Sequence, residues 1–459
     1  MTLAAIRADV DSIRMAAIDA VRPEALLPTR LALTGSELLL DGSSFSPPVA
    51  LRSRVVVVGG GKAAAGVAAA IERLIVPATS VGLPVAGLVS VPEGCGRRLA
   101  HVEVRETRPL AANLPTPAAV AATHEMRAML AELGSDDLAI VIVTGGGSAL
   151  IEEPRDGVSL AGTIALARHL SAAGAGIRDL NTVRQPLSVV KAGGLAQACS
   201  AGRLVTLVLS DIIGNPLDLI ASGPCMPVAA NPVAALDVLR RYAALDVDPA
   251  ITRLLEREAA AWPRDAAAAG GDWTTPRGCR VSHVLLGTNA TAVEAAAAMA
   301  HRLGYDTTVN SSAADDESAA EVGGRLARDA ARLLDAAADG RPRAIVEGGE
   351  ATVVLPRDHG RGGRNQQTVL AALAVWSGDW PAGLAVASIG TDGEDGPTDA
   401  AGGVVDADVA AAVAERRLDV DTAVRRCDAY PLLDAVGGLI RTGPTGTNVA
   451  DVRLILFRP

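Results

Sequence analysis

Acidic residues and glycines alternate in the segment IGTDGEDGPTDAAGG, which spans residues 389–403 and follows the apolar run LAVAS. The flexible glycines let Asp392 and Asp395 converge on one ligand. Carboxylate oxygens are the ligands that Mg²⁺ prefers in proteins. The pattern therefore predicts a metal site at Asp392 and Asp395, and an acidic surface turn is the alternative that the same residues allow.

Two glycine-rich turns each join an apolar run to a helical stretch, in VVVVGGGKAAAG (residues 55–66) and IVIVTGGGSAL (residues 140–150). A turn of this kind offers backbone N–H groups and the positive end of a helix dipole to an anion. We expect the two turns to bind phosphate or substrate through Gly60, Gly61, Lys62, Gly145, Gly146, Gly147 and Ser148. A purely structural turn, and for Ser148 a helix cap, are the alternatives.

The first turn resembles two nucleotide-binding motifs without matching either completely. It is not a Walker loop, because Val57 and Ala63 occupy the positions that need glycine and a hydroxyl residue. Gly59, Gly61 and Ala64 do fit the dinucleotide fingerprint, but no acidic residue ends a second strand about 20 residues later, where a ribose would need one.

A third group of polar residues lies in NTVRQPLSVVKAGGLA, residues 181–196. Asn181, Arg184, Ser188 and Lys191 would share one face of a helix, and Arg184 and Lys191 could then hold a carboxylate or phosphate. A solvated polar face is the alternative. Pro186 argues against a regular helix, because proline disfavours helical geometry in the residue before it.

Further polar residues follow predicted strands. Arg364, Asn365 and Gln366 form a donor-rich triplet suited to an anionic group. Asp211 is placed to hold a metal or orient a hydroxyl, although capping a turn is the commoner role. The other candidate ligand residues are Ser222, Glu350, Thr445, Thr447 and Asn448.

Short apolar runs separated by Ala-rich helical stretches must position these residues. The predicted strands span residues 54–61, 85–91, 138–147, 204–211, 282–289, 343–349, 384–393 and 452–457. Strands that alternate with helices indicate an α/β class. We expect two Rossmann-like α/β domains with mostly parallel sheets facing a shared cleft, because glycine loops at strand ends form ligand sites in such sheets. Loss of helical periodicity between Trp262 and Gly278 places the domains at residues 1–265 and 280–459.

Composition excludes several classes of partner. The net charge of −10 and an aromatic content of 2% argue against nucleic acid and anionic membranes. Ile6, Val10 and Ile13 recur at helical spacing near the N-terminus, which predicts a packing helix rather than a targeting segment. Five scattered cysteines without zinc-ligand spacing indicate reduced thiols, so we expect a cytoplasmic protein. A homodimer is compatible with the sequence.

The motifs together resemble the class II glycerate 2-kinase family, whose C-terminal portion is called MOFRL and whose members are often labelled hydroxypyruvate reductase. GGGKAA, TGGGSALIEEP, LNTVRQPLSVVKAGGLAQA, LSDIIGNPLDLIASGP, GGEATV, GRGGRNQQ, GTDGEDGPTDAAGG and TGPTGTNVAD carry the resemblance along nearly the whole chain. It implies phosphorylation of glycerate, or a related sugar acid, at the 2-hydroxyl with ATP and Mg²⁺. By this likeness Lys62 and Arg364 match the catalytic cations, and Asp211 joins them as a catalytic candidate.

The chain departs from the family pattern at Thr116, Asn215 and Gln367, where the family usually has acidic residues, and at Cys225, where threonine is usual. Two alternatives therefore accompany the kinase. One is an NAD(P)H-dependent hydroxypyruvate reductase, which the glycine fingerprint suggests. The other is a diverged protein that binds a sugar acid without turnover, which the neutral replacements suggest.

Overall fold

The structure is a computed structural model that describes residues 3–34, 37–41, 43–50, 54–76, 85–109, 113–262, 271–310, 317–376 and 380–459. The chain forms two compact units. The seven-stranded unit comprises Leu26–Leu209 and Asn215–Leu286, and the six-stranded unit comprises Met1–Ala25, Ser210–Gly214 and Gly287–Pro459. The first 25 residues thus group with the C-terminal part of the chain. As independently folding domains, the ranges 1–265 and 280–459 stay a prediction.

The seven-stranded sheet has the order β6-β5-β4-β7-β8-β10-β9. Its strands are β4 (Val55–Gly60), β5 (Val85–Pro92), β6 (Val102–Arg108), β7 (Leu138–Thr144), β8 (Arg203–Leu209), β9 (Trp273–Thr274) and β10 (Arg280–Gly287). The run from β6 to β8 is parallel. The carboxyl ends of these strands therefore share one edge, where loops can form a ligand site.

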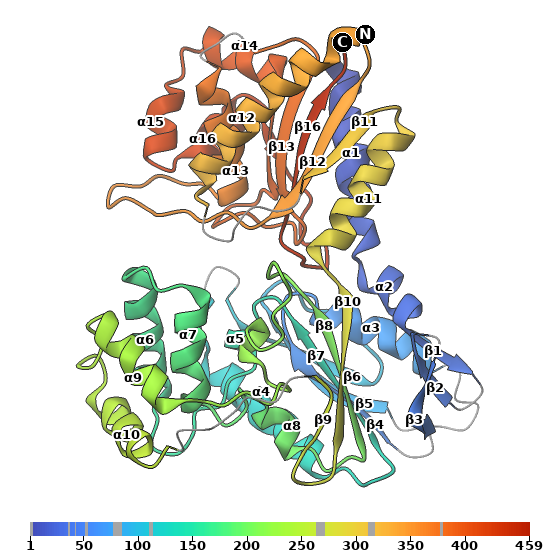
Figure 1. The fold of residues 1–459 in the computed structure, drawn as a ribbon, viewed down its shortest axis with the longest axis vertical. Coiled ribbons are helices and arrows are strands. Elements are labelled where there is room, and N and C mark those ends of the chain that lie inside the picture. The colour runs from blue at the N-terminus through green and yellow to red at the C-terminus, as the bar shows by residue number, and fades with distance from the viewer. Residues whose placement is uncertain are drawn as a thin grey trace. The chain divides into compact units, whose positions relative to one another are not determined.

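The helices of this unit serve different purposes. α3 (Ala64–Ile75) and α4 (Pro117–Ala131) pack on the sheet. α6 (Leu160–Ala172), α7 (Ile177–Arg184), α9 (Pro232–Arg241) and α10 (Pro249–Ala260) share a separate apolar cluster, which appears as a group of green helices beside the sheet in Figure 1. The remaining elements are α2 (Pro23–Arg30), β1 (Leu31–Thr34), β2 (Glu37–Leu40), β3 (Ser43–Ala50), α5 (Gly147–Leu150) and α8 (Gly194–Ala198).

The six-stranded sheet has the order β11-β12-β16-β13-β14-β15. Its strands are β11 (Asp306–Asn310), β12 (Arg343–Gly349), β13 (Leu384–Gly390), β14 (Gly402–Val405), β15 (Leu439–Ile440) and β16 (Asp451–Phe457). β16 lies between β12 and β13 and runs antiparallel to both. β12 and β13 consequently run in the same direction, and β11 is parallel to β12.

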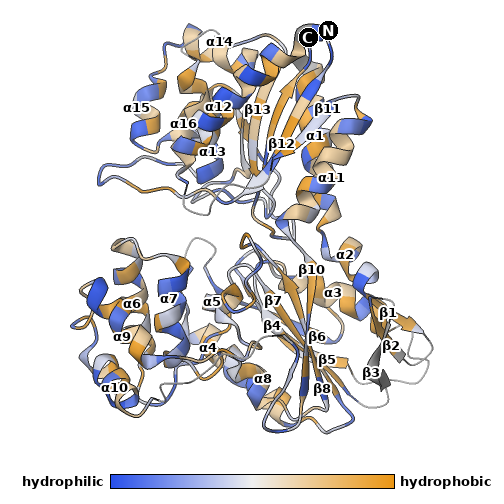
Figure 2. Ribbon diagram, in the orientation of Figure 1, coloured by the Kyte–Doolittle hydropathy of each residue, from blue (hydrophilic) through white to orange (hydrophobic). Residues whose placement is uncertain are grey.

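Helices cover both faces of this sheet. α1 (Leu3–Ala20) and α11 (Asn289–Arg302) pack on one face, and α12 (Ala319–Ala336) and α13 (Arg364–Val375) pack on the other (Figure 1). α14 (Ala407–Glu415), α15 (Val420–Arg425) and α16 (Ala429–Ala435) complete the unit. The strands of both sheets are mostly apolar in Figure 2, as sheets covered on both faces should be.

The predicted α/β class is confirmed, and each of the eight predicted strands is present. Parallel pairing runs from β6 to β8 in the seven-stranded sheet, whereas the six-stranded sheet is mixed. The predicted N-terminal helix is also confirmed, with Ile6, Val10 and Ile13 buried. The helix considered for residues 181–191 is not continuous. α7 ends at Arg184, a short 3-10 turn covers Gln185–Leu187, and Ala192 has a positive φ of 52°.

Candidate active site

The turn after β4 places Lys62 at the shared edge of the seven-stranded sheet. Gly61 has a φ of 138°, and a Cβ there would lie 1.9 Å from Thr144 Oγ1. The backbone of Lys62 donates to the carbonyl of Gly145 (2.9 Å), and that of Ala63 donates to Thr144 Oγ1 (3.2 Å). These bonds join the two predicted glycine turns, so Gly60, Gly61 and Lys62 lie beside the Gly145 turn.

The second turn, after β7, brings three distant segments together. Gly146 precedes α5 in a left-handed conformation with a φ of 78°. The hydroxyl of Ser148 lies 3.3 Å from that of Ser222, which in turn donates to Asn181 Oδ1 (2.7 Å). Gly147 lacks room for a side chain, because a Cβ would lie 2.9 Å from Ala221. The loop is therefore fixed by its neighbours.

Lys191 lies beneath this loop with its side chain fully buried. Its ammonium group contacts the carbonyls of Ser148 (2.9 Å) and Ile151 (3.2 Å) and the carboxylate of Glu152 (3.2 Å). A lysine has three N–H donors, so all three are used. Burial lowers the pKa of Lys191, and Glu152 acts against that shift. The contacts indicate that Lys191 supports the loop.

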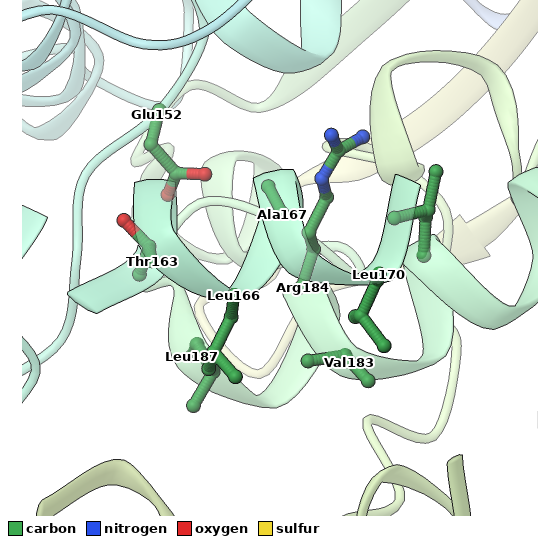
Figure 3. A pocket seen from close by; sticks show the side chains of 9 residues that line it. Glu152, Thr163, Leu166, Ala167, Leu170, Val183, Arg184 and Leu187 are labelled. Atoms are coloured by element: carbon green, nitrogen blue, oxygen red, sulfur yellow. The ribbon is translucent and has the colours of Figure 1, made fainter. Parts of the chain in front are cut away.

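Arg184 lies at the end of α7 and borders a cavity of about 10 Å³, enough for a single water molecule. Figure 3 shows the heads of Glu152 and Arg184 on one side of this cavity and Leu166, Val183 and Leu187 on the other. Burial lowers the pKa of the Arg184 guanidinium, opposed by the charge of Glu152. The Oε1 atom of Glu152 is buried and makes no hydrogen bond within the described part of the chain.

Lys62 and Lys191 are the only two lysines in a sequence that has 42 lysines and arginines together. Both lie at the glycine turns, and Lys62 is half-buried. A compact ammonium and a planar guanidinium are not interchangeable. Both lysines of the sequence therefore lie beside the same loop, which is where the chain uses an ammonium group in place of a guanidinium. We name Gly60, Gly61, Lys62, Gly145–Ser148, Arg184, Lys191 and Ser222 the cationic loop site.

Arg364 is the centre of a second group, in the six-stranded unit. It begins α13, and its Nε and Nη2 atoms donate to the two oxygens of Asp451 at 2.7 and 2.9 Å. Its Nη1 atom donates to Glu350. Burial alone would lower the pKa of the Arg364 guanidinium, but Asp451 and Glu350 raise it well above its ordinary value. Burial raises the pKa of Glu350, while Arg364 acts in the opposite direction.

The first turn of α13 is held by an acidic residue from the glycine-rich segment. Asp395 accepts from the backbone N–H groups of Asn365 (3.0 Å) and Gln366 (2.8 Å), and Asn365 Nδ2 also donates to Asp451 (3.0 Å). Burial raises the pKa of Asp395 to about 7, and the two backbone bonds act against this shift. Both oxygens of Asp395 thus already serve the helix N-terminus.

The loop before β16 packs on the turn after β13. Thr445 donates from its hydroxyl to the carbonyl of Thr391 (2.6 Å) and from its backbone to that of Asp392 (3.1 Å). Asn448 Nδ2 donates to Asp211 Oδ2 (3.1 Å), which brings Asp211 to the same loop. Thr447 instead donates to the carbonyl of Val21 (2.5 Å) and is buried, so its hydroxyl has a packing role.

We name Glu350, Arg364, Asn365, Asp392, Asp395 and Asp451 the acidic site. Its four carboxylates outnumber its single guanidinium. In the cationic loop site, Lys62, Arg184 and Lys191 outnumber the one neighbouring carboxylate, that of Glu152. Within the described residues, no cluster of three or more His, Cys, Asp or Glu side chains could hold a metal ion by itself. The acidic site therefore offers negative charge without a complete protein-made metal cage.

Sequence reasoning missed Asp451, Glu152 and Arg108. Asp451 is fully buried and orients Arg364, and it is the last residue of the segment TGPTGTNVAD. Glu152 follows the second glycine turn and pairs with Lys191. Arg108 ends β6 and is 4% exposed. A charged residue directly at a strand end was the available signal for Arg108 and Asp451.

The residues that depart from the expected pattern have local structural roles. Thr116 caps α4 by accepting from the backbone of Ala119 (3.1 Å). Asn215 has a positive φ of 54°, a conformation that asparagine adopts more readily than most residues. Gln367 is buried in α13 and donates to the carbonyl of Val424 (2.7 Å). Burial raises the pKa of the Cys225 thiol to about 12.

The fold and the two sites define a two-unit α/β protein whose polar groups collect at strand ends beside glycine turns. Residues 9–256 match a family described as a domain of unknown function, DUF4147, and residues 343–451 match the MOFRL family. The chain belongs to the glycerate kinase family.

Relatives and solved structures extend over nearly the whole chain. A glycerate kinase from Bos taurus is 34% identical, covering 96% of this chain and 91% of its own length. A glycerate 2-kinase from Pyrococcus horikoshii is 31% identical, with coverages of 95% and 94%. The crystal structure of a glycerate kinase from Thermotoga maritima has a TM-score of 0.78 at 28% identity, covering 99% of both chains. In the described part of this chain, no helix is long and apolar enough to cross a membrane.

Proposed function

We propose that this protein is a glycerate 2-kinase, which transfers the terminal phosphoryl group of ATP to the 2-hydroxyl of glycerate and yields 2-phosphoglycerate. Identity of 34% to a glycerate kinase over 96% of the chain is the observation that carries the proposal. The residues support it as well. Phosphoryl transfer depends mainly on positioning and charge neutralisation, and the chain supplies a lysine on glycine turns and a rigidly held arginine.

Within the proposal, Lys62 and the backbone N–H groups of Gly60, Gly61 and Gly145–Ser148 hold phosphoryl oxygens. Arg364 stabilises charge that develops during transfer, because Asp451 and Glu350 fix its guanidinium in one orientation. Arg184 binds the carboxylate of the sugar acid. Ser222 completes the polar surroundings of the cationic loop site. Asn365, Thr445 and Asn448 do so in the six-stranded unit, where Asp211 accepts from Asn448 and is proposed to orient the reacting hydroxyl.

Lys191 and Thr447 take different parts from those expected of ligand residues. The three donors of Lys191 are used by Ser148, Ile151 and Glu152, so we assign it to positioning the loop. The hydroxyl of Thr447 is used by Val21. Glu350 touches Arg364 and acts with Asp451 as a positioning residue.

The carboxylate oxygens of the acidic site could supply some, but not all, of the ligands of Mg²⁺. Mg²⁺ commonly takes one or two carboxylates together with substrate phosphates and water, so a complete protein cage is not required. Asp392 and Asp395 are the carboxylates proposed for this role. Asp395 accepts from the N-terminus of α13 with both oxygens, and Asp392 Oδ1 accepts from the backbone of Glu394 (3.0 Å). When bound, the ion would supply neutralisation of charge on the phosphates. The cytoplasmic location and the homodimer stay predictions.

The reductase alternative is not favoured. Its main sequence feature was the glycine fingerprint, and two of those glycines have another explanation in the sheet. A Cβ on Gly59 would lie 2.0 Å from the carbonyl oxygen of Ile142, and one on Gly61 would lie 1.9 Å from Thr144 Oγ1. Close approach of β4 to β7 is therefore sufficient reason for both glycines.

The test is an assay of ADP release with D-glycerate, ATP and Mg²⁺, with the product identified by mass and by its conversion in a 2-phosphoglycerate-specific coupled reaction. Lys62→Ala and Arg364→Ala should each lower kcat by at least about 10²-fold, in the range found when one charge-stabilising group is lost. Arg361→Ala is the matched control for Arg364, because Arg361 is an exposed neighbour that stacks on Tyr430.

ADP release that needs glycerate, together with 2-phosphoglycerate as product, supports the proposal. Failure of glycerate to stimulate ADP release, while NADH is consumed with hydroxypyruvate, overturns it in favour of the reductase. Thermal stabilisation by glycerate without either reaction supports the binding protein instead.

A further inference from the structure

The carboxyl end of β6 carries a buried arginine at the glycine turns. Arg108 is the last residue of β6, paired across the sheet with Pro92 of β5, and its carbonyl accepts from the backbone of Glu93 (2.8 Å). The residue is 4% exposed. Its Nη1 atom donates to the carbonyl of Pro109 (3.0 Å), which holds one edge of the guanidinium in place.

The guanidinium of Arg108 lies directly against the second glycine turn. A Cβ on Gly146 would lie 2.9 Å from Arg108 Nη2 and 3.8 Å from Lys62 Cγ. Arg108 and Lys62 therefore flank the same glycine. Gly146 has two reasons to be glycine, since its φ of 78° is left-handed and a side chain would displace the guanidinium.

The strand that carries Arg108 is fixed at both ends. At its start, the carboxylate of Glu72 accepts from the backbone of Ala100 (3.1 Å), His101 (2.8 Å) and Val102 (2.8 Å). At its end, the hydroxyl of Thr107 pairs with that of Ser90 at 2.5 Å. A cation on so firmly held a strand keeps its orientation, as preorganised electrostatic groups must.

We propose that Arg108 is a third anion-binding cation of the cationic loop site, donating to the oxyanion that rests on Gly145–Ser148. The inference builds on the proposed kinase and deepens it. The shared chemistry is an oxyanion, either a phosphoryl group of ATP or the carboxylate of glycerate. A guanidinium presents a planar pair of N–H donors that matches both, and Lys62 supplies a point charge beside it.

The test compares Arg108→Gln and Arg108→Lys with Arg105→Gln, and measures kcat and the KM for ATP and for glycerate. Arg105 is the matched control, because it lies on the same strand but pairs with Glu103 and Glu125 near the surface. We expect kcat/KM to fall at least tenfold for Arg108→Gln, with partial loss for Arg108→Lys, and to change less than twofold for Arg105→Gln. A raised KM for ATP identifies the phosphoryl group, and a raised KM for glycerate identifies the carboxylate.

Both Arg108 variants within twofold of the wild type in all three parameters would overturn the inference. Arg108→Lys preserves the positive charge, so it decides the matter if Arg108→Gln does not fold. If the wild type shows no glycerate-dependent ADP release, the proposed function fails, and thermal stabilisation by tripolyphosphate replaces the kinetic test. Stabilisation that is reduced in Arg108→Lys but kept in Arg105→Gln then still supports Arg108 as an anion ligand, and equal stabilisation of all three proteins refutes it.

Discussion

The two lysines of the chain differ in what their ammonium groups can contact. Lys62 is half-buried on the first glycine turn. Lys191 donates to Ser148, Ile151 and Glu152 with its three N–H groups. One carboxylate and two carbonyls accept from all three N–H donors of the Lys191 ammonium group. The loop that Lys62 helps to form is therefore supported from below by a buried ion pair.

Replacement of Lys191 should be costly for stability. Lys191→Met leaves the carboxylate of Glu152 buried without its partner, and breaking a buried pair in this way costs about 3–5 kcal/mol of unfolding free energy. The double variant Lys191→Met with Glu152→Gln should recover part of that loss. Urea denaturation measures both. Arg240→Met is the control, because its exposed pair with Asp237 should contribute at most about 1 kcal/mol. A Lys191→Met loss as small as the control would refute the supporting role.

His283 should make stability fall in weak acid. Burial lowers its pKa below the ordinary value, while its Nε2 atom donates to the carbonyl of Cys225 (3.1 Å). The unfolded chain then binds a proton at a higher pH than the folded chain. The free energy of unfolding should therefore decrease as pH falls through about 6.5 and below.

The decrease is measured by urea unfolding at several pH values between 7 and 5. His283→Gln keeps a donor for the carbonyl of Cys225 but cannot titrate, so its unfolding free energy should depend less on pH. An identical pH dependence in the two proteins would show that His283 does not contribute.

At the scale of elements, α13 shows how a helix start can organise a site. Its first turn receives Asp395 from the turn after β13, while Asp451 at the start of β16 binds Arg364 and Asn365. Ser388 in β13 donates to Asn365 Oδ1 (2.5 Å). The helix is therefore tied to the strands β13 and β16, and its first residue is held in place.

Residues in the interior of α13 are buried, so introducing a carboxylate there should lower the stability of the protein. Gln367→Glu restores the acidic residue that is usual in the family. It also replaces the amide that donates to the carbonyl of Val424, so that a carboxylate oxygen faces a carbonyl oxygen at a position that is 4% exposed. An unsatisfied buried polar group costs about 1–3 kcal/mol. We expect a loss of that size in thermal or urea unfolding. Gln197→Glu, at an exposed position of α8, should change stability by less than about 0.5 kcal/mol. Unchanged stability in Gln367→Glu would mean that the site relaxes to accept the acid.

Local patterns predicted the strands well, because β-branched runs such as VVVV and IVIV before glycine turns encode both extension and its end. The same runs located Lys62 and Ser148, whereas Arg364 was located by the glycines of GRGGRNQQ before a predicted helix. The position of β16 between β12 and β13 depends on pairing between segments about 60 to 110 residues apart, which no local pattern records. The capping of α13 by Asp395 and the burial of Lys191 also arise only from tertiary contacts.

At the scale of the molecule, the N-terminal helix belongs to the six-stranded unit. α1 packs on α11, β13 and β16, and Asp9 accepts from Tyr305 (2.7 Å) and Arg458 (2.8 Å). The seven-stranded unit lies between these segments in the sequence. The six-stranded unit is thus built from segments that precede and follow the seven-stranded unit in the sequence.

This arrangement predicts where a defect in α1 is felt. Ile13 is fully buried, so Ile13→Ala should cost about 2–5 kcal/mol. In hydrogen exchange, faster exchange is expected in α11, β13 and β16, with β4 and β7 unchanged. Met15→Ala, at a position that is 38% exposed, is the control and should leave all five elements unchanged. Faster exchange confined to β4 and β7 would contradict the assignment of α1.

The antiparallel insertion of β16 also has a consequence for synthesis on the ribosome. Domains tend to fold as they emerge, from the N-terminus onward. α1 emerges first, whereas β16, which pairs with both β12 and β13, emerges more than 400 residues later. Until then β12 and β13 lack their shared neighbour and present strand edges that invite pairing with other chains. The nascent six-stranded unit should therefore depend on chaperone protection for longer than the seven-stranded unit, whose strands are all translated by residue 287.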